Sequence, residues 1–365
     1  MLKKRVLILT GKAGSGHLTV AQAYQYWLTK WGYEAWVLDV LPPINEKINN
    51  WLYKVPKTYK QLFAFSNNKA WARLVTLPSK MEIERRIRKL APDYKSADMI
   101  ISTHPLIHPT WGKKRVMTLM DPIVHAVYLV LPRAQHYISF WKDCEGNTKG
   151  FGIAAKRVSY TGPLARPLFY ENARNLRKNH YKGECKKTLG IAPETTLVLV
   201  MAGQAWIYRA AEYLQYFKNI FRKENVIFAF MCGKNKDFAQ QMSSKYRRVK
   251  MFKILNWLSE EEVCRWMAAA DFGVAFSLAQ MAVEAGLSKL PIYIFRLIEG
   301  QEEGYRAVIE DNGVGMYVPG EPQNQVEILK VLYKHTQTMF GKNLVNWQKE
   351  LLEAPNRVKK VLEKI

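Results

Sequence analysis

The sequence predicts an α/β protein built from two doubly wound parallel-sheet domains that face a central cleft. The chain has 365 residues, which is more than one compact core usually holds. Short apolar runs alternate with helical patterns in both halves, and such alternation produces parallel sheets through crossover connections. A segment rich in proline and glycine, residues 160–169, separates the halves and is interpreted as the link between domains. Ligands of such domains bind at the carboxyl ends of the strands, so both sheets are expected to border one cleft.

The first half begins with an apolar strand, and the alternation then continues to the linking segment. The predicted strands are 5–9, 35–39, 98–102, 115–120 and 136–140, and the predicted helices are 18–30 and 80–90. The alternation restarts after the linking segment. The strands expected there are 197–201, 226–231, 250–254, 272–275 and 291–294, and the helices are 209–221, 236–245, 260–269 and 280–287.

Composition limits the compartment and the partners. The basic first residues are followed by an apolar run of only four residues, Val6–Leu9, so no export signal is expected, and no apolar stretch reaches the length of a membrane-spanning helix. The four cysteines are widely spaced without a C-x-x-C pair, which indicates a reducing cytoplasm, no disulfide and no zinc. Lys and Arg number 55 against 31 acidic residues, a net charge of +24. This excess favours a polyanionic partner: nucleic acid, an anionic membrane or a phosphorylated substrate.

One stretch concentrates this charge. Residues 47–80 hold seven lysines and arginines, no acid, and aromatic side chains between them. Rings beside ammonium groups suit the headgroup layer of an anionic membrane, so the stretch predicts membrane docking at the cytoplasmic face. The docking residues are predicted to be Trp51, Lys54, Lys57, Lys60, Phe63 and Trp71. Two alternatives remain: a helical pair whose aromatics pack inward, or a platform for single-stranded nucleic acid. No nucleic-acid motif supports the last, so no nucleic acid is expected.

The turn after the first strand contains a histidine among glycines. Gly11, Gly14 and Gly16 allow a sharp turn and a close approach to a ligand. The sequence His17-Leu18 excludes a nucleotide-triphosphate loop, and Thr19 stands where a dinucleotide fingerprint needs a small residue. His17 is therefore predicted to be a base at a helix N-terminus, since its pKa lies near working pH. The competing interpretation is a capping histidine without chemistry.

Further polar residues follow the strands of the first half. Asp121 comes directly after the strand at 115–120, where it is expected to face the cleft, orient His17 or contact an acceptor; a capping aspartate is the alternative. His125 follows four residues later and joins the catalytic candidates. His104 and His108 lack a third ligand at suitable spacing, so they are interpreted as loop residues and no metal site is expected.

Several motifs in order resemble the glycosyltransferases that make monogalactosyl- and glucosyl-diacylglycerol. This family is related to the lipid II-forming N-acetylglucosaminyltransferase. The motifs that carry the resemblance are G-x-G-H at 14–17, T-L-M-D with His125 at 118–125, G-P-x-x-R-P at 162–167, C-G-K-N at 232–235, W-M-A-A-A-D at 266–271, G-Q-E-E-G at 300–304 and D-N-G-x-G at 311–315. The resemblance covers most of the chain.

The resemblance implies a GT-B fold and inverting, metal-independent transfer of a hexose from a UDP-sugar to a lipid such as diacylglycerol. It implies an acceptor and membrane-docking domain at 1–163, a nucleotide-sugar domain at 164–343, and a final helix at 344–365 that can cross back. His17 is the base that it implies, and UDP-sugar is a co-substrate with no cofactor. The donor residues are Gly203, Gly233, Asn235, Leu258, Glu284, Gln301 and Glu302.

The sequence departs from the family in the donor half. Phe276 stands where the family has a lysine, and Leu278-Ala279-Gln280-Met281 replaces a glycine-rich turn. Ala202-Gly203-Gln204-Ala205-Trp206 replaces a second glycine-rich turn. Such turns let backbone N–H groups hold a diphosphate. Two alternatives therefore stay open: a non-catalytic relative that binds lipid or a partner, or a glycosyltransferase with a different donor or acceptor.

Overall fold

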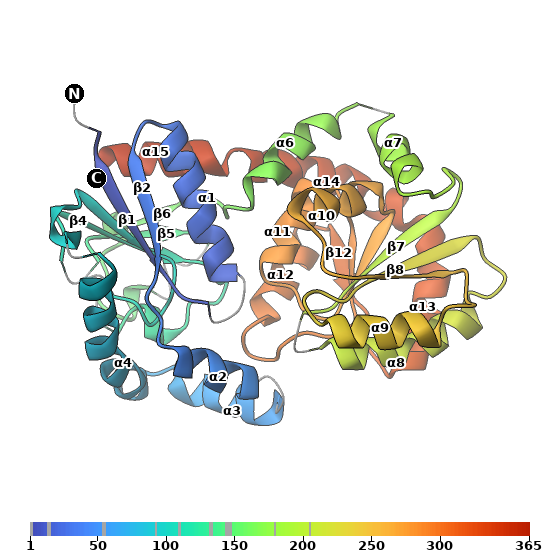
Figure 1. Ribbon diagram of the computed structural model, residues 1–365, viewed down its shortest axis with the longest axis horizontal. Coiled ribbons are helices and arrows are strands. Elements are labelled where there is room, and N and C mark those ends of the chain that lie inside the picture. The colour runs from blue at the N-terminus through green and yellow to red at the C-terminus, as the bar shows by residue number, and fades with distance from the viewer. Residues whose placement is uncertain are drawn as a thin grey trace. The chain divides into compact units, whose positions relative to one another are not determined.

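The computed structural model describes residues 3–12, 16–52, 56–91, 93–108, 111–130, 134–142, 148–178, 180–203 and 206–365. The chain divides into two compact units, each an α/β layer structure (Figure 1). The first unit comprises Met1–Pro167, Glu299–Gly304 and Glu350–Ile365, and the second comprises Leu168–Ile298 and Tyr305–Lys349. The chain thus leaves the first unit inside the proline- and glycine-bearing segment.

The first unit contains a six-stranded parallel sheet with the order β2-β1-β3-β4-β5-β6. Its strands are β1 (Arg5–Thr10), β2 (Glu34–Asp39), β3 (Met99–Ser102), β4 (Lys114–Leu119), β5 (His136–Ser139) and β6 (Val158–Tyr160). Its helices are α1 (Gly16–Lys30), α2 (Pro43–Leu52), α3 (Pro56–Ser66), α4 (Lys69–Leu90) and α15 (Ala354–Lys364). Val6, Ile8 and Ile100 in the central strands are fully buried, as expected for a sheet covered on both faces.

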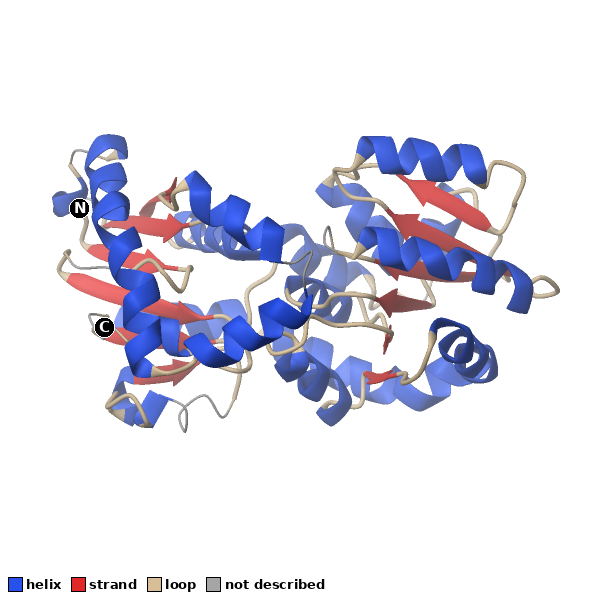
Figure 2. Ribbon diagram, turned by 90° about the horizontal axis from the view of Figure 1, so that it is seen from below, coloured by secondary structure: helices blue, strands red, loops and turns tan. Residues whose placement is uncertain are grey.

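The second unit repeats this plan with the order β12-β11-β10-β7-β8-β9. Its strands are β7 (Thr196–Met201), β8 (Val226–Met231), β9 (Phe252–Leu255), β10 (Phe272–Ala275), β11 (Ile292–Ile294) and β12 (Gly315–Tyr317). The helices are α6 (Pro167–Asn175), α7 (Tyr181–Thr188), α8 (Ile207–Ile220), α9 (Lys236–Lys245), α10 (Glu260–Ala269), α11 (Gln280–Leu287), α12 (Glu303–Asp311), α13 (Pro322–Leu332) and α14 (Thr336–Leu352). Figure 2 shows helices on both faces of each sheet. The predicted fold class is confirmed.

The structure corrects some predicted elements. The helix expected at 80–90 begins at Lys69, because the side chain of Asn68 caps it by accepting from Ala70 N and Trp71 N, both at 3.1 Å. The short strand β6 was not predicted, since its three residues are too few for an alternating pattern to register. Within the described ranges, no helix is long and apolar enough to cross a membrane.

Candidate active site

His17 is held in one tautomer at the start of α1. Its Nδ1 lies 2.7 Å from the carbonyl oxygen of Thr103 and 3.3 Å from Met120 Sδ. Because a carbonyl can only accept, Nδ1 carries the hydrogen and the lone pair is on Nε2. This is the form that a general base requires. Gly16 opens α1 with no atom close to where a Cβ would stand, whereas Gly14 lies outside the described residues.

Thr103, directly after β3, binds His17 a second time. Its Oγ1 lies 3.2 Å from the His17 carbonyl oxygen and 2.9 Å from Thr10 Oγ1 at the end of β1. Thr103 N–H donates to Leu9 O at 3.0 Å, which continues the ladder between β1 and β3. Thr103 therefore ties the first turn of α1 to the carboxyl ends of both strands.

His104 packs against the candidate base, a contact that the sequence did not predict. The two imidazole centroids are 4.6 Å apart, and His104 is buried. A Cβ on Gly11 would stand 3.1 Å from His104 Cδ2 and 2.6 Å from Leu41 Cβ, so this position requires glycine. His104 lies in a loop as predicted, but its burial and its contact with His17 were not predicted. The sequence offered one sign of this contact, since His104 closely follows the strand predicted at 98–102. His108 is more peripheral, with Nε2 at 2.8 Å from Val127 O.

The electrostatics keep His17 neutral. Burial lowers the pKa of the His17 imidazole, while the charge of Asp121 and the hydrogen bond to Thr103 oppose this lowering only in part. Burial also lowers the pKa of His104 well below its usual value, together with the neighbouring His17 and His108. Asp121, directly after β4, accepts a hydrogen bond from Tyr128 OH at 3.1 Å. The first unit thus places a neutral imidazole within electrostatic range of a carboxylate.

His125 does not fit the catalytic prediction. Its Nδ1 accepts from Val127 N at 3.2 Å, so its Nε2 carries the hydrogen and donates to Phe63 O at 3.0 Å. Its ring also packs on Phe63 with centroids 4.5 Å apart. Since both nitrogens bind backbone, we interpret His125 as an anchor of α3. Asn67 adds to this anchor, since its Oδ1 accepts from Ala126 N at 2.8 Å.

The predicted sugar-binding residues Gln301 and Glu302 lie in the segment Glu299–Gly304, which clusters with the first unit. Lys60 on α3 forms an ion pair with Glu299 at 2.9 Å. Gly300 has φ +87°, and a Cβ there would meet Phe63 at 3.1 Å. Lys60 therefore pairs with a carboxylate, and Phe63 is half-buried between Gly300 and His125. Lys60 remains exposed in this ion pair, whereas Phe63 is only partly accessible, so the docking prediction for these two residues stays a prediction.

Other side chains of α3 and α4 do form an exposed apolar surface. Leu74 is 58% exposed and Met81 is 80% exposed, and the rings of Phe65 and Trp71 pack together with centroids 4.3 Å apart. We call this set the apolar patch; its members are Leu62, Phe65, Trp71, Leu74, Leu77 and Met81. The buried residues of α4 are Ala72, Thr76, Ile83 and Ile87. Helical spacing puts these on the opposite face, so α4 is apolar both toward the core and toward solvent. Lys54 and the side chains of Trp51 and Lys57 lie outside the described residues.

In the second unit, the predicted donor residues follow four neighbouring strands at their carboxyl ends. Gly203 follows β7, and a Cβ there would stand 3.1 Å from Ser277. Gly233 follows β8 with φ +57°, and Asn235 caps α9 by accepting from Phe238 N at 3.2 Å. Leu258 follows β9, immediately before the capping box of α10. Glu284 is buried on α11, which follows β10.

The altered donor turn keeps an unusual backbone. Phe276 is fully buried and packs on Tyr213 with centroids 4.7 Å apart, so no cation stands there. Ala279 has φ +46° and ψ −131°, a conformation that glycine adopts far more easily. An alanine therefore holds, beside the predicted donor site, a backbone conformation that favours glycine.

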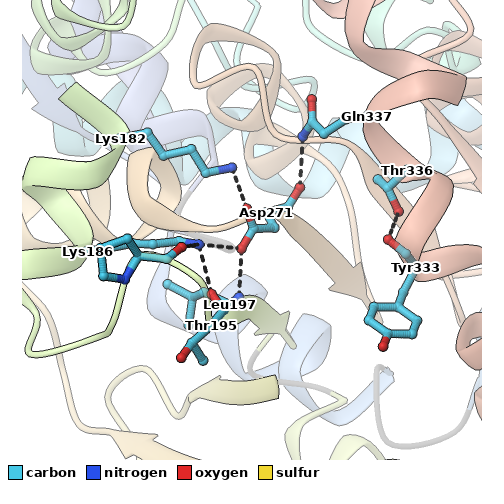
Figure 3. Close-up of polar contacts among 9 residues, drawn as sticks. Lys182, Lys186, Thr195, Leu197, Asp271, Tyr333, Thr336 and Gln337 are labelled. Atoms are coloured by element: carbon cyan, nitrogen blue, oxygen red, sulfur yellow. Dashed lines mark hydrogen bonds and ion pairs between the residues drawn. The ribbon is translucent and has the colours of Figure 1, made fainter. Parts of the chain in front are cut away.

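Asp271 of the W-M-A-A-A-D motif lies at the other edge of this sheet, before β10. Figure 3 shows that Lys182, Lys186 and the Leu197 N–H converge on its carboxylate, at 2.7, 2.8 and 2.8 Å. Burial alone would raise the pKa of Asp271, but these donors outweigh it and hold the pKa below the usual value. The motif therefore anchors α7 to the sheet. Among the described residues, no group of three His, Cys, Asp or Glu side chains could hold a metal ion.

Comparison with known proteins agrees with this architecture. No protein-family model matches the chain. The processive diacylglycerol beta-glucosyltransferase of Bacillus subtilis is 23% identical over 336 residues, covering 86% of this chain and 83% of that protein. The chloroplastic monogalactosyldiacylglycerol synthase of Spinacia oleracea is 26% identical over 347 residues, again 86% of this chain; the chain spans only 63% of that synthase.

Solved structures share the fold at low identity. HepE from Anabaena in complex with UDP has a TM-score of 0.57 at 14% identity, over 100% of both chains. WaaG, a glycosyltransferase involved in lipopolysaccharide biosynthesis, has a TM-score of 0.60 at 13% identity, over 98% of this chain and 99% of WaaG. The solved structures show the GT-B fold, and over 86% of its length the chain is similar in sequence to the diacylglycerol glucosyltransferases and the monogalactosyldiacylglycerol synthases.

Proposed function

We propose that this protein transfers a hexose from a UDP-sugar to a lipid acceptor such as diacylglycerol at a membrane surface. In this reaction His17 Nε2 takes the proton of the acceptor hydroxyl while that oxygen attacks the anomeric carbon. The bond between the anomeric carbon and the diphosphate breaks, UDP leaves with the electron pair, and the configuration inverts. The step uses no metal ion and no cofactor.

One observation carries the proposal: the hydrogen bond of 2.7 Å from His17 Nδ1 to Thr103 O. It fixes the lone pair on Nε2 and sets the ring orientation, as a base that accepts a single proton needs. Asp121 is the nearby anion that would stabilise the imidazolium formed during transfer. A histidine that only caps a helix would not need a buried neighbour such as His104 or a fixed tautomer.

The donor half of the proposal rests on the carboxyl edge of the second sheet. Glu284 would bind the ribose hydroxyls and Leu258 the uracil edge. The proposed role of Gln301 and Glu302 in binding the sugar hydroxyls rests on the family resemblance alone, since both cluster with the first unit. Gly203, Gly233 and Asn235 would lie near the diphosphate. The turn at Ala279 supports this assignment, since strained backbone conformations of this kind are frequent at ligand-binding sites.

The membrane part of the proposal rests on the apolar patch. Exposed apolar side chains on the outer face of α4 would enter the headgroup layer, and Arg73, exposed on the same helix, would meet anionic lipid. So many exposed apolar side chains are unusual for a solvated helix and support contact with a membrane. The net charge of +24 also favours binding to an anionic membrane.

Thermal unfolding across a panel of nucleotides and UDP-sugars is the first test. A rise in melting temperature with UDP and with one UDP-sugar is expected, followed by transfer of that sugar to diacylglycerol in anionic vesicles, unchanged by EDTA. A panel without any shift would contradict the donor assignment. It would favour the non-catalytic lipid-binding relative, which the burial of Phe276 at the lysine position also favours.

A further inference from the structure

A metal-free transfer must balance the negative charge that builds up on the leaving diphosphate. In this chain the position where the family has a lysine is Phe276, whose side chain is fully buried. We propose that Arg296 supplies the missing positive charge and binds the donor diphosphate. The inference rests on the proposed function, because it assigns a ligand-binding residue to the same donor site.

Arg296 lies at the carboxyl edge of the second sheet. It follows β11, and the backbone N–H groups of Phe295 and Arg296 donate to Ala275 O at 2.9 and 3.4 Å. Ala275 is the last residue of β10, directly before Phe276 and Ser277. Ser277 in turn is 3.1 Å from the Cβ position of Gly203 after β7. Arg296, Ser277 and Gly203 therefore follow three adjacent strands at the edge where open α/β sheets bind ligands.

A directed chain of hydrogen bonds orients the guanidinium. Arg296 Nε donates to Tyr213 OH at 3.2 Å, and Tyr213 OH donates to Gln325 Oε1 at 2.7 Å. Gln325 is fully buried, and its Nε2 donates to Phe295 O at 2.9 Å and to Val318 O. Since the amide nitrogen of Gln325 serves two carbonyls, only its oxygen is left for Tyr213, and the tyrosine oxygen must accept from arginine. These hydrogen bonds use Nε of Arg296, and no described residue accepts from its Nη groups, which can therefore donate to a ligand.

The same tyrosine joins Arg296 to the substituted position. Tyr213 packs on Phe276 and on Phe295, with ring centroids 4.7 and 5.5 Å away. Phe276 also lies 5.9 Å from Phe295. Phe276, at the position of the family's lysine, is thus part of an aromatic cluster with Tyr213 and Phe295. The Tyr213 hydroxyl in this cluster binds Arg296. The cation has moved from the end of β10 to the end of β11.

Arg296 has no direct counter-ion among the described residues, although Glu212 and Glu321 act at longer range on its partner Tyr213. Arg296 is half-buried, and no ion pair joins it to a described carboxylate within 4.0 Å. A half-buried cation without a counter-ion is costly, so an anion at this edge is stabilising. A guanidinium whose Nη groups have no partner among the described residues can bind two phosphate oxygens at once, which suits a diphosphate better than a neutral nucleoside.

The test measures how Arg296→Gln changes the binding of UDP and of uridine to the full-length protein, by calorimetry at low salt. We expect UDP binding to weaken about tenfold or more, because a charge-assisted pair is lost, and uridine binding to stay within about twofold. Arg296→Lys keeps the charge but not the paired geometry, so an intermediate loss is expected. Arg248→Gln, which removes the same charge before β9 at the opposite sheet edge, should leave UDP binding unchanged.

The outcomes separate the two proposals. If the wild-type protein binds neither UDP nor uridine, the donor site itself is wrong. If the wild type binds UDP and Arg296→Gln binds it equally well, the donor site stands and the inference about Arg296 is overturned. An equal loss for UDP and uridine would also overturn it, since that pattern reports a disturbed fold rather than a lost phosphate contact.

Discussion

The two units of this protein differ in how closely the turns after their strands match the family pattern. In the first unit, the turn after β1 leads into a histidine whose tautomer, ring contact and nearby carboxylate are all in place, at His17, His104 and Asp121. In the second unit, the turns after β7 and β10 lack the glycines and the lysine that the family resemblance implies, and Phe276 packs in an aromatic core. Proton transfer depends on a few side chains in fixed positions, whereas a phosphate site depends mostly on backbone shape and net charge.

This difference explains how the donor side can change more than the acceptor side. Backbone shape can persist without glycine if the surrounding structure bears the strain, as at Ala279. Charge can move to a neighbouring strand, as proposed for Arg296. An imidazole that must reach one hydroxyl has no such alternative position. The predictions below test each side of this contrast.

The largest effect is expected for His17→Ala. Without the base, turnover should fall by about 100-fold to 10,000-fold, since general base catalysis contributes that much, while UDP affinity should change less than twofold. Turnover is measured with the UDP-sugar and diacylglycerol in vesicles, and affinity by calorimetry. His180→Ala is the matched control, because His180 is an exposed histidine on the second unit with only a surface partner, Glu184 at 3.6 Å. Full turnover in His17→Ala would remove this histidine as the base.

Asp121→Asn should shift the pH dependence as well as the rate. Asp121 raises the pKa of His17 against the lowering effect of burial, so removing its charge lowers that pKa further. The base is active when unprotonated; the acidic limb of kcat/KM should therefore move to lower pH. The rate at the plateau should fall about tenfold or more, because the imidazolium loses its counter-charge. A series of kcat/KM values between about pH 4.5 and 9 measures both effects. An acidic limb that stays in place would show that Asp121 does not act on the base.

The apolar patch is expected to have a smaller effect, confined to membrane binding. Replacing Leu74 and Leu77 together with serine should weaken sedimentation with anionic vesicles about tenfold, since two apolar side chains no longer leave water. The melting temperature should not change, because both side chains already face solvent. Val331→Ser on α13 is the control, as Val331 is 72% exposed in the second unit. Equal vesicle binding by the double variant would rule out the patch as the docking surface.

The sequence predicted the sheets better than the sites, and the reason is physical. A local apolar run is enough to predict a buried strand such as β8, and this strand was predicted at its observed bounds, Val226–Met231. The contact of His104 with His17 depends instead on a glycine and a leucine far along the chain, Gly11 and Leu41. Arg296 was missed because nothing local marks a loop arginine whose partner, Tyr213, lies on α8. The ion pair of Lys60 was missed for the same reason, since its partner Glu299 is distant in sequence.

The smallest expected effect tests whether the donor turn is strained. Ala279→Gly should raise the free energy of unfolding of the second unit by about 1 kcal/mol, because φ +46° with ψ −131° is costly for alanine and allowed for glycine. Ala282→Gly, three residues later inside α11, should have the opposite sign and cost about 1 kcal/mol, since that alanine is in an ordinary helical conformation. Urea unfolding of the two variants measures the difference. If both variants lose stability alike, the turn at Ala279 is not strained, and the prediction is wrong. If the signs differ, the second unit maintains the backbone of a phosphate-binding turn at a cost in stability, which is expected of a site that still binds its donor.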